Sequence, residues 1–172
     1  PQMLLQEYYR DIIERDVRRR VSARSSLTLS QLVKAVFEST GSEISLRSLA
    51  KTLNITADTV RTYLEACEAA YILFQCPYFT FSEKQRASRN RKYYPIDLGL
   101  RNTVITRGGQ DLGKNLETVV FHHLRKKYAK VFYWRDKGEV DFVVQDGNEI
   151  IPYQVSWEAK KERHEKAIEE FR

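Results

Sequence analysis

The sequence has few cysteines and no long apolar run. Its two cysteines, Cys67 and Cys76, are separated and lack Cys-x-x-Cys spacing, so we expect neither a disulfide framework nor a zinc cluster, and we expect a reducing, cytoplasmic setting. No apolar stretch reaches the roughly 18 residues that span a bilayer, and no charged-then-apolar signal pattern is present. We therefore predict a chain that neither crosses a membrane nor is exported through one.

The sequence also lacks the Gly-x-x-x-x-Gly-Lys-Ser/Thr loop whose backbone amides bind the phosphates of ATP, so ATP hydrolysis is not expected from these residues. What is present is a chain of 172 residues, 42% hydrophobic and 12% aromatic, which suffices for one large domain or two small ones. The 29 basic and 23 acidic residues give a formal charge of +6. This charge favours a polyanion such as nucleic acid, or an acidic protein surface, as partner.

The first half of the chain has helical periodicity. Apolar residues recur at three- and four-residue spacing in residues 4–17, 29–37, 46–53 and 60–67. We expect the run Arg18 to Arg20 to end the first helix. Ser45 and Thr56 stand where helix N-caps belong, on either side of a turn at Asn54. Two capped helices across a tight turn predict a helix-turn-helix.

Two β-forming runs, 71–76 and 92–96, follow the second capped helix. The loop between them is basic, which predicts either a wing lying along nucleic-acid phosphates or an ordinary solvated hairpin tip. The basic residues assigned to this loop are Lys84, Arg86, Arg89, Arg91 and Lys92.

If duplex DNA is bound, the helix after Thr56 is the expected recognition helix. Thr59, Arg61 and Thr62 lie near its start and are the candidate base-reading residues. The same helix carries acidic residues, which repel phosphates, and winged helices also dock proteins. Duplex reading and protein docking therefore both remain open for this helix.

The residue pattern in the second half of the chain predicts a helix, three strands and a further helix. We expect a flexible linker at Arg107 to Gly109, and hence domains at 1–106 and 107–172. In the first helix Leu116, Val119, Val120 and Leu124 form the expected buried stripe, and Asp146, Gly147 and Asn148 predict a tight turn between two strands. The last helix stops without a cap or breaker, so we expect a fragment truncated at its C-terminus.

Polar residues of the last two strands are predicted to share one sheet face. A Gly147-Asn148 turn sets Asp141 opposite Gln154, whereas an Asp146-Gly147 turn sets Glu139 opposite it. Either register places Asp141, Gln154 and Ser156 together. A solvated sheet face is one explanation. The other is a nuclease site to which Glu117 adds a carboxylate, since acidic residues bind Mg²⁺ through oxygen and a nearby lysine orients the attacking water.

Several segments resemble the C-terminal region of a family of prokaryotic AAA-type ATPases. In the second half these segments are Gly113-Lys-Asn-Leu-Glu117, Gly138-Glu-Val-Asp-Phe-Val-Val144 and Ile151-Pro-Tyr-Gln-Val-Ser156. In the first half they are Tyr9-Arg-Asp-Ile-Ile-Glu-Arg15, the Leu49 to Leu64 helix-turn-helix and Lys92-Tyr-Tyr-Pro-Ile-Asp-Leu-Gly99. The resemblance implies an α+β fold, with a helical linker and winged-helix domain followed by a restriction-endonuclease-like α/β domain of the PD-(D/E)xK type, which has a small mixed sheet.

The same resemblance assigns roles in the nuclease-like site. Glu117 and Asp141 match the two acidic, metal-binding positions, whereas Gln154 and Ser156 stand where the family fold has glutamate and lysine. Gln154 brings no negative charge and Ser156 brings no cation. Glu139 or Glu158 would be the replacement acid, and Lys114 the replacement lysine, in an active enzyme.

The leading expectation is a non-catalytic fragment that binds nucleic acid or a protein partner under control of its own N-terminal ATPase domain. That domain lies outside this sequence, and the resemblance implies that it carries ATP. The alternatives are an active Mg²⁺- or Mn²⁺-dependent DNA nuclease and a winged-helix transcriptional regulator. No cofactor is expected in the fragment itself apart from Mg²⁺ in the nuclease reading.

Overall fold

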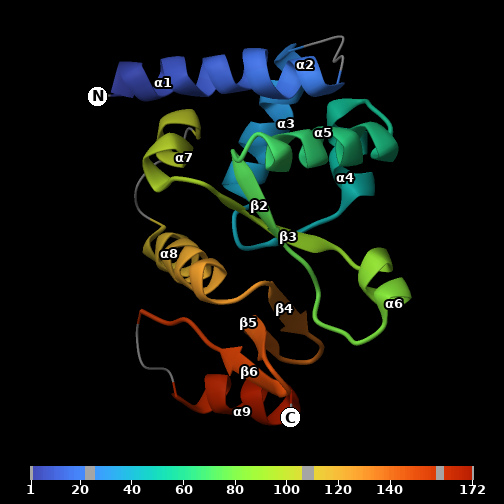
Figure 1. Cartoon of the computed structure of the whole chain (residues 1–172), viewed down its shortest axis with the longest axis vertical. Helices are drawn as coiled ribbons and strands as arrows, with labels where there is room; N and C mark the ends of the chain where they lie inside the picture. The colour runs from blue at the N-terminus through green and yellow to red at the C-terminus, as the bar shows by residue number, and fades with distance from the viewer. Residues whose placement is uncertain (1, 22–25, 106–110, 158–160, 172) are drawn as a thin grey trace. The chain divides into compact units, whose positions relative to one another are not determined.

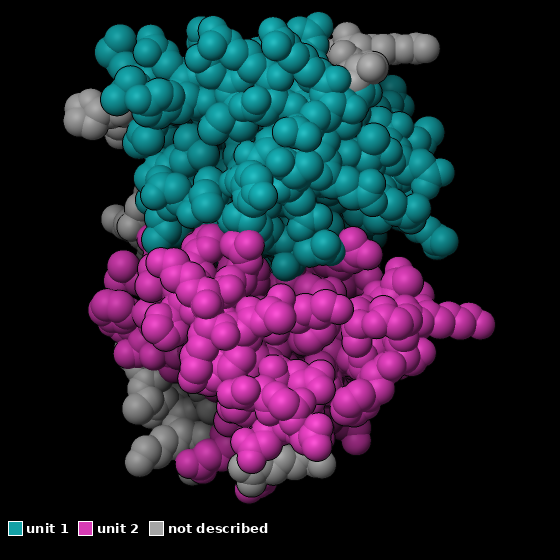
Figure 2. Space-filling model, in the orientation of Figure 1, with its two compact units in different colours: residues 1–75, 93–110 teal, residues 76–92, 111–172 magenta. Residues whose placement is uncertain are grey.

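The computed structural model describes residues 2–21, 26–105, 111–157 and 161–171 (Figure 1). The expected linker at Arg107 to Gly109 and the candidate acid Glu158 lie outside these residues. The chain forms two compact units (Figure 2). Unit 1 comprises residues 1–75 and 93–110, and unit 2 comprises residues 76–92 and 111–172. Helices and small antiparallel sheets occur together, so the α+β class is confirmed.

Unit 1 begins with a continuous helical segment. Helix α1 (Gln2–Asp11) leads through the π-helical turn η1 (Ile12–Val17) into α2 (Arg18–Val21). The arginine run is itself helical, and the described helix ends at Val21, one residue after Arg20. Arginine is a good helix former, and Arg18 is 2.8 Å from Glu14 one turn earlier, which supports the helix through the run.

The two predicted capped helices are confirmed. They follow α3 (Ser26–Glu38) and are α4 (Leu46–Leu53) and α5 (Ala57–Ala69). The Ser45 hydroxyl accepts the Ser48 N–H at 3.3 Å, and the Thr56 hydroxyl accepts the Thr59 N–H at 3.1 Å. Asn54 has φ 53° between the helices, a left-handed conformation that asparagine tolerates.

Both predicted β runs form strands. The three-stranded sheet contains β1 (Glu43–Ile44), β2 (Leu73–Cys76) and β3 (Arg91–Pro95) in the order β1-β3-β2, and α7 (Leu98–Val104) follows with Asp97 as its N-cap. Apolar side chains from the helices and strands of unit 1 form one core. Its fully buried members include Val17, Leu29, Leu32, Phe37, Val60, Cys67 and Ile72.

Unit 2 is built on a second sheet. It contains α6 (Glu83–Ser88), α8 (Leu112–Lys127), β4 (Val131–Arg135), β5 (Glu139–Asp146), β6 (Glu149–Tyr153) and α9 (Lys161–Phe171). The strands are antiparallel in the order β4-β5-β6, and α8 and α9 both contact β5. A single parallel bridge between Tyr78 and Tyr133 extends the sheet, with the Phe79 N–H donating to the Tyr133 carbonyl at 2.7 Å. The three strands β4, β5 and β6 are thus antiparallel, in contrast to the expected mixed sheet, and the parallel pairing is confined to an isolated bridge outside them.

The buried stripe of α8 differs from the expected one. Val119 is 56% exposed, while Thr118, Phe121 and Leu124 are buried. Leu124 is thus buried as predicted, whereas contact with the sheet buries Phe121 instead of Val119, the centroid of the Phe121 ring lying 5.8 Å from that of Phe142 on β5. In the described residues no helix has both the length and the apolar character needed to cross a membrane.

The register of the last hairpin resolves the two predicted alternatives. Asp146 pairs with Glu149 and Phe142 with Tyr153, so the turn is Gly147-Asn148. Gly147 has φ 59°, where glycine carries no steric penalty. Extending the register by one pair places Asp141 opposite Gln154, as that alternative predicted.

Candidate functional site

The predicted site contains a buried lysine that the sequence analysis assigned to an exposed loop. The side chain of Lys92, on β3, is 2% exposed. Its ammonium nitrogen is 2.6 Å from Glu139 Oε1 and 3.7 Å from Glu117 Oε1. We call Lys92, Glu117, Glu139, Asp141 and Gln154 the lysine–carboxylate cluster. All five belong to unit 2.

The carboxylates keep this buried lysine charged. Burial by itself lowers the pKa of an ammonium, because water no longer solvates the charge. In the lysine–carboxylate cluster the attraction of Glu117, Glu139 and Asp141, with the hydrogen bond to Glu139, outweighs burial and raises the pKa of Lys92 above 10.5. The ammonium is also 5.2 Å from the centroid of the Tyr133 ring, a further favourable contact for a cation.

Asp141 is engaged by its own neighbours. Its Oδ2 accepts a hydrogen bond from the Gln154 amide at 2.7 Å and another from the Val155 N–H at 2.8 Å. Both donors stabilise the ionised carboxylate. The predicted meeting of Asp141 and Gln154 is therefore confirmed. Ser156 lies exposed on the segment after β6.

The cluster does not suit a divalent cation as it stands. Carboxylate oxygens and the Gln154 carbonyl are the donor types that Mg²⁺ prefers, and the Gln154 Oε1 is buried without a hydrogen-bond partner among the described residues. However, the Lys92 ammonium lies against the Glu117 and Glu139 carboxylates and repels a dication. Across the described residues no group of three or more His, Cys, Asp or Glu side chains has a metal-binding arrangement. The cluster is thus a set of acids compensated by an internal cation.

The candidate base-reading residues of α5 make contacts within their own helix. Arg61 is 3.4 Å from Asp58, and the Thr62 hydroxyl donates to the Asp58 carbonyl at 2.9 Å. The Thr59 and Thr56 hydroxyls are 2.8 Å apart in the N-cap. The acidic residues Asp58 and Glu65 are exposed on α5, as are Arg61 and Thr62. These exposed positions therefore carry two acidic side chains and one basic side chain.

The basic segment is a helix and a strand rather than a polar loop. Arg86 pairs with Glu83 at 2.5 Å, donates to the Thr80 carbonyl and lies 4.9 Å above the Phe132 ring. Arg89 lies 4.8 Å above the ring of Tyr78. The expectation of a loop is wrong because guanidinium groups stack on aromatic rings and Ser82 caps α6. Lys84 is exposed on α6 and Arg91 is partly exposed at the start of β3.

Sequence reasoning did not place Lys92 in the nuclease-like site. The signal for its burial was its position in a β-forming run directly before Tyr93 and Tyr94, both of which are buried. A charged residue within such a run needs partners when it is buried. The sequence could not identify those partners, because they lie on other elements.

The structure and the site define an α+β protein of two units, with an internal lysine–carboxylate cluster in the second. Residues 1–111 match the model of a domain of unknown function, DUF8612, and the chain belongs to this family. Residues 112–172 match a second model, the domain of unknown function DUF4143.

An uncharacterized protein of Haemophilus influenzae is 24% identical to the chain over 168 residues. The similarity covers 94% of the chain and 42% of that relative, so the chain spans less than half the length of the relative it matches. No solved structure matches the chain.

Proposed function

We propose that this chain is a non-catalytic, nucleic-acid-binding module of a prokaryotic AAA-type ATPase, in which a winged helix precedes a nuclease-like domain. The observation that carries the proposal is the lysine–carboxylate cluster. Lys92 pairs with Glu139 and Glu117 inside it, and Asp141 is held by Gln154 and the Val155 N–H. In this proposal the Lys92 ammonium occupies the position that a catalytic dication would require. The acidic residues therefore pair with Lys92 instead of binding a metal.

The order of elements supports the domain assignment. Two capped helices, α4 and α5, precede the strands β2 and β3, as in a winged helix. In unit 2, Glu117 lies on helix α8 and Asp141 on the later strand β5, and this helix-then-strand order supports the proposed PD-(D/E)xK relationship. The Haemophilus relative is more than twice as long as the segment it shares with this chain, which leaves room for an ATPase domain.

The positive charge of the chain makes nucleic acid the first ligand to test. The net charge of +6 attracts phosphates, and exposed basic residues such as Arg47 and Lys51 on α4 are available for them. We expect the chain to shift labelled DNA in a gel at low ionic strength, and we expect affinity to fall steeply as salt rises because counterions are released on binding. Absence of any shift with duplex or single strand would remove nucleic acid and leave a protein ligand.

A second candidate, a nuclease, is favoured by one specific observation. Lys92 lies within 3.7 Å of Glu117 and could supply the cation that Ser156 lacks. Incubation of supercoiled plasmid with Mg²⁺ or Mn²⁺ tests this candidate. Nicking by the wild type that Asp141→Ala abolishes would establish the enzyme, whereas identical traces would exclude it.

A further inference from the structure

Unit 2 contains an aromatic pocket that the proposed nuclease-like site does not use. Its volume is about 500 Å³, within the range of small-ligand pockets. Five aromatic residues and one aliphatic side chain dominate its lining, together with the polar residues Thr80 and Gln85. The apolar lining residues are Tyr78, Phe79, Phe81, Trp134, Ile150 and Phe171. We call this cavity the aromatic pocket.

The rings of the aromatic pocket are held by one another. Phe79 meets Phe81, Phe132 and Phe171 edge to face, with ring centroids 5.3, 5.7 and 5.6 Å apart. Trp134 contacts Phe171 in the same manner at 5.5 Å. Phe81 is 82% exposed, so most of its ring is open to a stacking partner. A planar, aromatic ligand fits such a lining.

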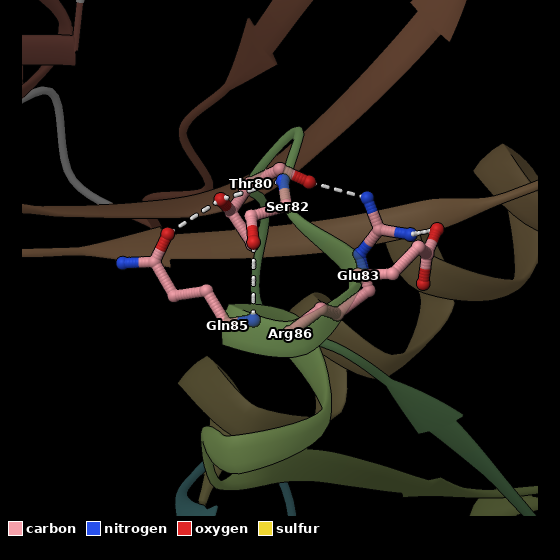
Figure 3. Close-up of polar contacts among 5 residues, drawn as sticks. All are labelled: Thr80, Ser82, Glu83, Gln85 and Arg86. Atoms are coloured by element: carbon pink, nitrogen blue, oxygen red, sulfur yellow. Dashed lines mark hydrogen bonds and ion pairs between the residues drawn. The ribbon is translucent and has the colours of Figure 1, made fainter.

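The side-chain amide of Gln85 lines the aromatic pocket. Figure 3 shows the hydrogen bonds that hold it. The Thr80 hydroxyl accepts the Ser82 N–H at 3.2 Å and donates to Gln85 Oε1 at 2.8 Å. Gln85 is further positioned because its own N–H donates to the Ser82 hydroxyl at 3.3 Å. The side-chain amide nitrogen of Gln85 makes no hydrogen bond within the described residues, so it can donate to an acceptor on a ligand.

The charge beside the aromatic pocket is basic. On α6, Glu83 is neutralised by Arg86 at 2.5 Å, whereas the neighbouring Lys84 is exposed and has no ion-pair partner among the described residues. Residues 83–92 contain five basic residues and one acidic residue. An anionic group attached to a planar ring would therefore find an unpaired cation next to Gln85.

From these contacts we infer that the aromatic pocket accepts an unstacked base of single-stranded nucleic acid. The base stacks on Phe81, its polar edge accepts from the Gln85 amide, and the adjoining phosphate faces Lys84. Proteins that bind single strands combine aromatic rings, on which any base can stack because every base has a π face, with cations along the backbone. The inference rests on the proposed nucleic-acid binding and assigns it a site and a strand type.

The test compares two 12-residue oligonucleotides of equal charge, oligo(dT) and an abasic strand, by fluorescence anisotropy with the full chain. The wild type is expected to bind oligo(dT) more tightly than the abasic strand. Phe81→Ser should weaken binding of oligo(dT) by on the order of tenfold, since one stacking contact is lost, and leave the abasic strand unaffected. Tyr8→Ser, at a 54% exposed aromatic residue of unit 1, is the matched control.

A second measurement, of tryptophan fluorescence, detects ligand binding in the aromatic pocket directly. The chain has two tryptophans, so Trp157→Phe leaves Trp134 as the single reporter, and oligo(dT) should quench its fluorescence. If the wild type and Phe81→Ser bind oligo(dT) equally and binding still depends on salt, the aromatic pocket is not the base-binding site. The proposed nucleic-acid binding would be unaffected by that result. No binding of either single strand by the wild type would overturn the inference, and the proposed function would fall as well only if duplex DNA also failed to bind. A concentration-dependent dimer abolished by Phe81→Ser, without an effect on oligonucleotides, would identify a second copy as the occupant and overturn the inference.

Discussion

At the scale of single residues, Lys92 is a buried cation whose charge is compensated within unit 2. It is buried, and two carboxylates compensate its charge at 2.6 and 3.7 Å. A buried ion pair is not a strong source of stability by itself, because both charges lose their water. Removal of one partner is costly, however, since the other charges stay buried without compensation.

We predict that Lys92→Met lowers the free energy of unfolding by about 3–5 kcal/mol, as measured by urea denaturation. Lys84→Met, at an exposed position, is the control and should change stability by no more than about 0.5 kcal/mol. Addition of Glu139→Gln to Lys92→Met should recover part of the loss. A Lys92→Met variant as stable as the wild type would contradict the assigned pairing.

The raised pKa of Lys92 also predicts an alkaline dependence of stability. A lysine whose folded pKa exceeds its unfolded value stabilises the protein fully below the unfolded value, and the contribution disappears as pH rises through the folded value. The wild type should therefore lose stability above pH 10.5, and Lys92→Met should lose less over the same range. Parallel stability profiles of the two proteins would argue against a charged, paired Lys92.

At the scale of elements, predictions from local patterns succeeded where the interactions are local. The N-caps Ser45 and Thr56 and the turn at Gly147 depend on residues within a few positions, and all three were predicted correctly. The buried face of α8 and the conformation of residues 83–88 were not, because β5 and the ring of Phe132 determine them from elsewhere in the chain.

The packing of α9 on the sheet provides a prediction at this scale. A Cβ atom at Gly138 would lie 3.1 Å from the Cα and Cβ of Ala167 and 2.9 Å from Glu170 Oε2. Gly138→Ala should therefore destabilise the protein by about 1–3 kcal/mol in thermal or urea unfolding, since α9 must move. Gly113→Ala is the matched control, because its Cβ would meet nothing closer than 4.0 Å and alanine favours the helix by about 0.5–1 kcal/mol. Equal effects of the two substitutions would show that α9 does not pack tightly there.

At the scale of the whole molecule, unit 2 is assembled from two separated parts of the chain. Residues 76–92 bring the parallel bridge at Tyr78, the stacked guanidinium of Arg86 and the Lys92 ammonium to the segment 111–172. The segment 112–172 that matches the second family model therefore lacks the cation of its own acidic cluster.

We predict that a fragment of residues 111–172 does not fold alone. Glu117 and Glu139 would be left without Lys92, and the edge of β4 without its bridge. Fusion of residues 76–92 to this fragment through a flexible linker should restore cooperative unfolding by circular dichroism, whereas a scrambled 76–92 sequence should not. Cooperative unfolding of the fragment by itself would contradict the interdependence of the two parts.

The sequence by itself determined the local elements and the shared face of the last two strands. Helical periodicity and capping residues predicted the helices, and the alternation of period two put Asp141 and Gln154 on one face. The choice of the Gly147-Asn148 turn over the Asp146-Gly147 turn came from the structure. Only the tertiary structure decided which cation those acids receive. Lys92 reaches Glu117 and Glu139 from a distant segment of the chain. These carboxylates keep its ammonium charged, because burial without them would favour the neutral amine.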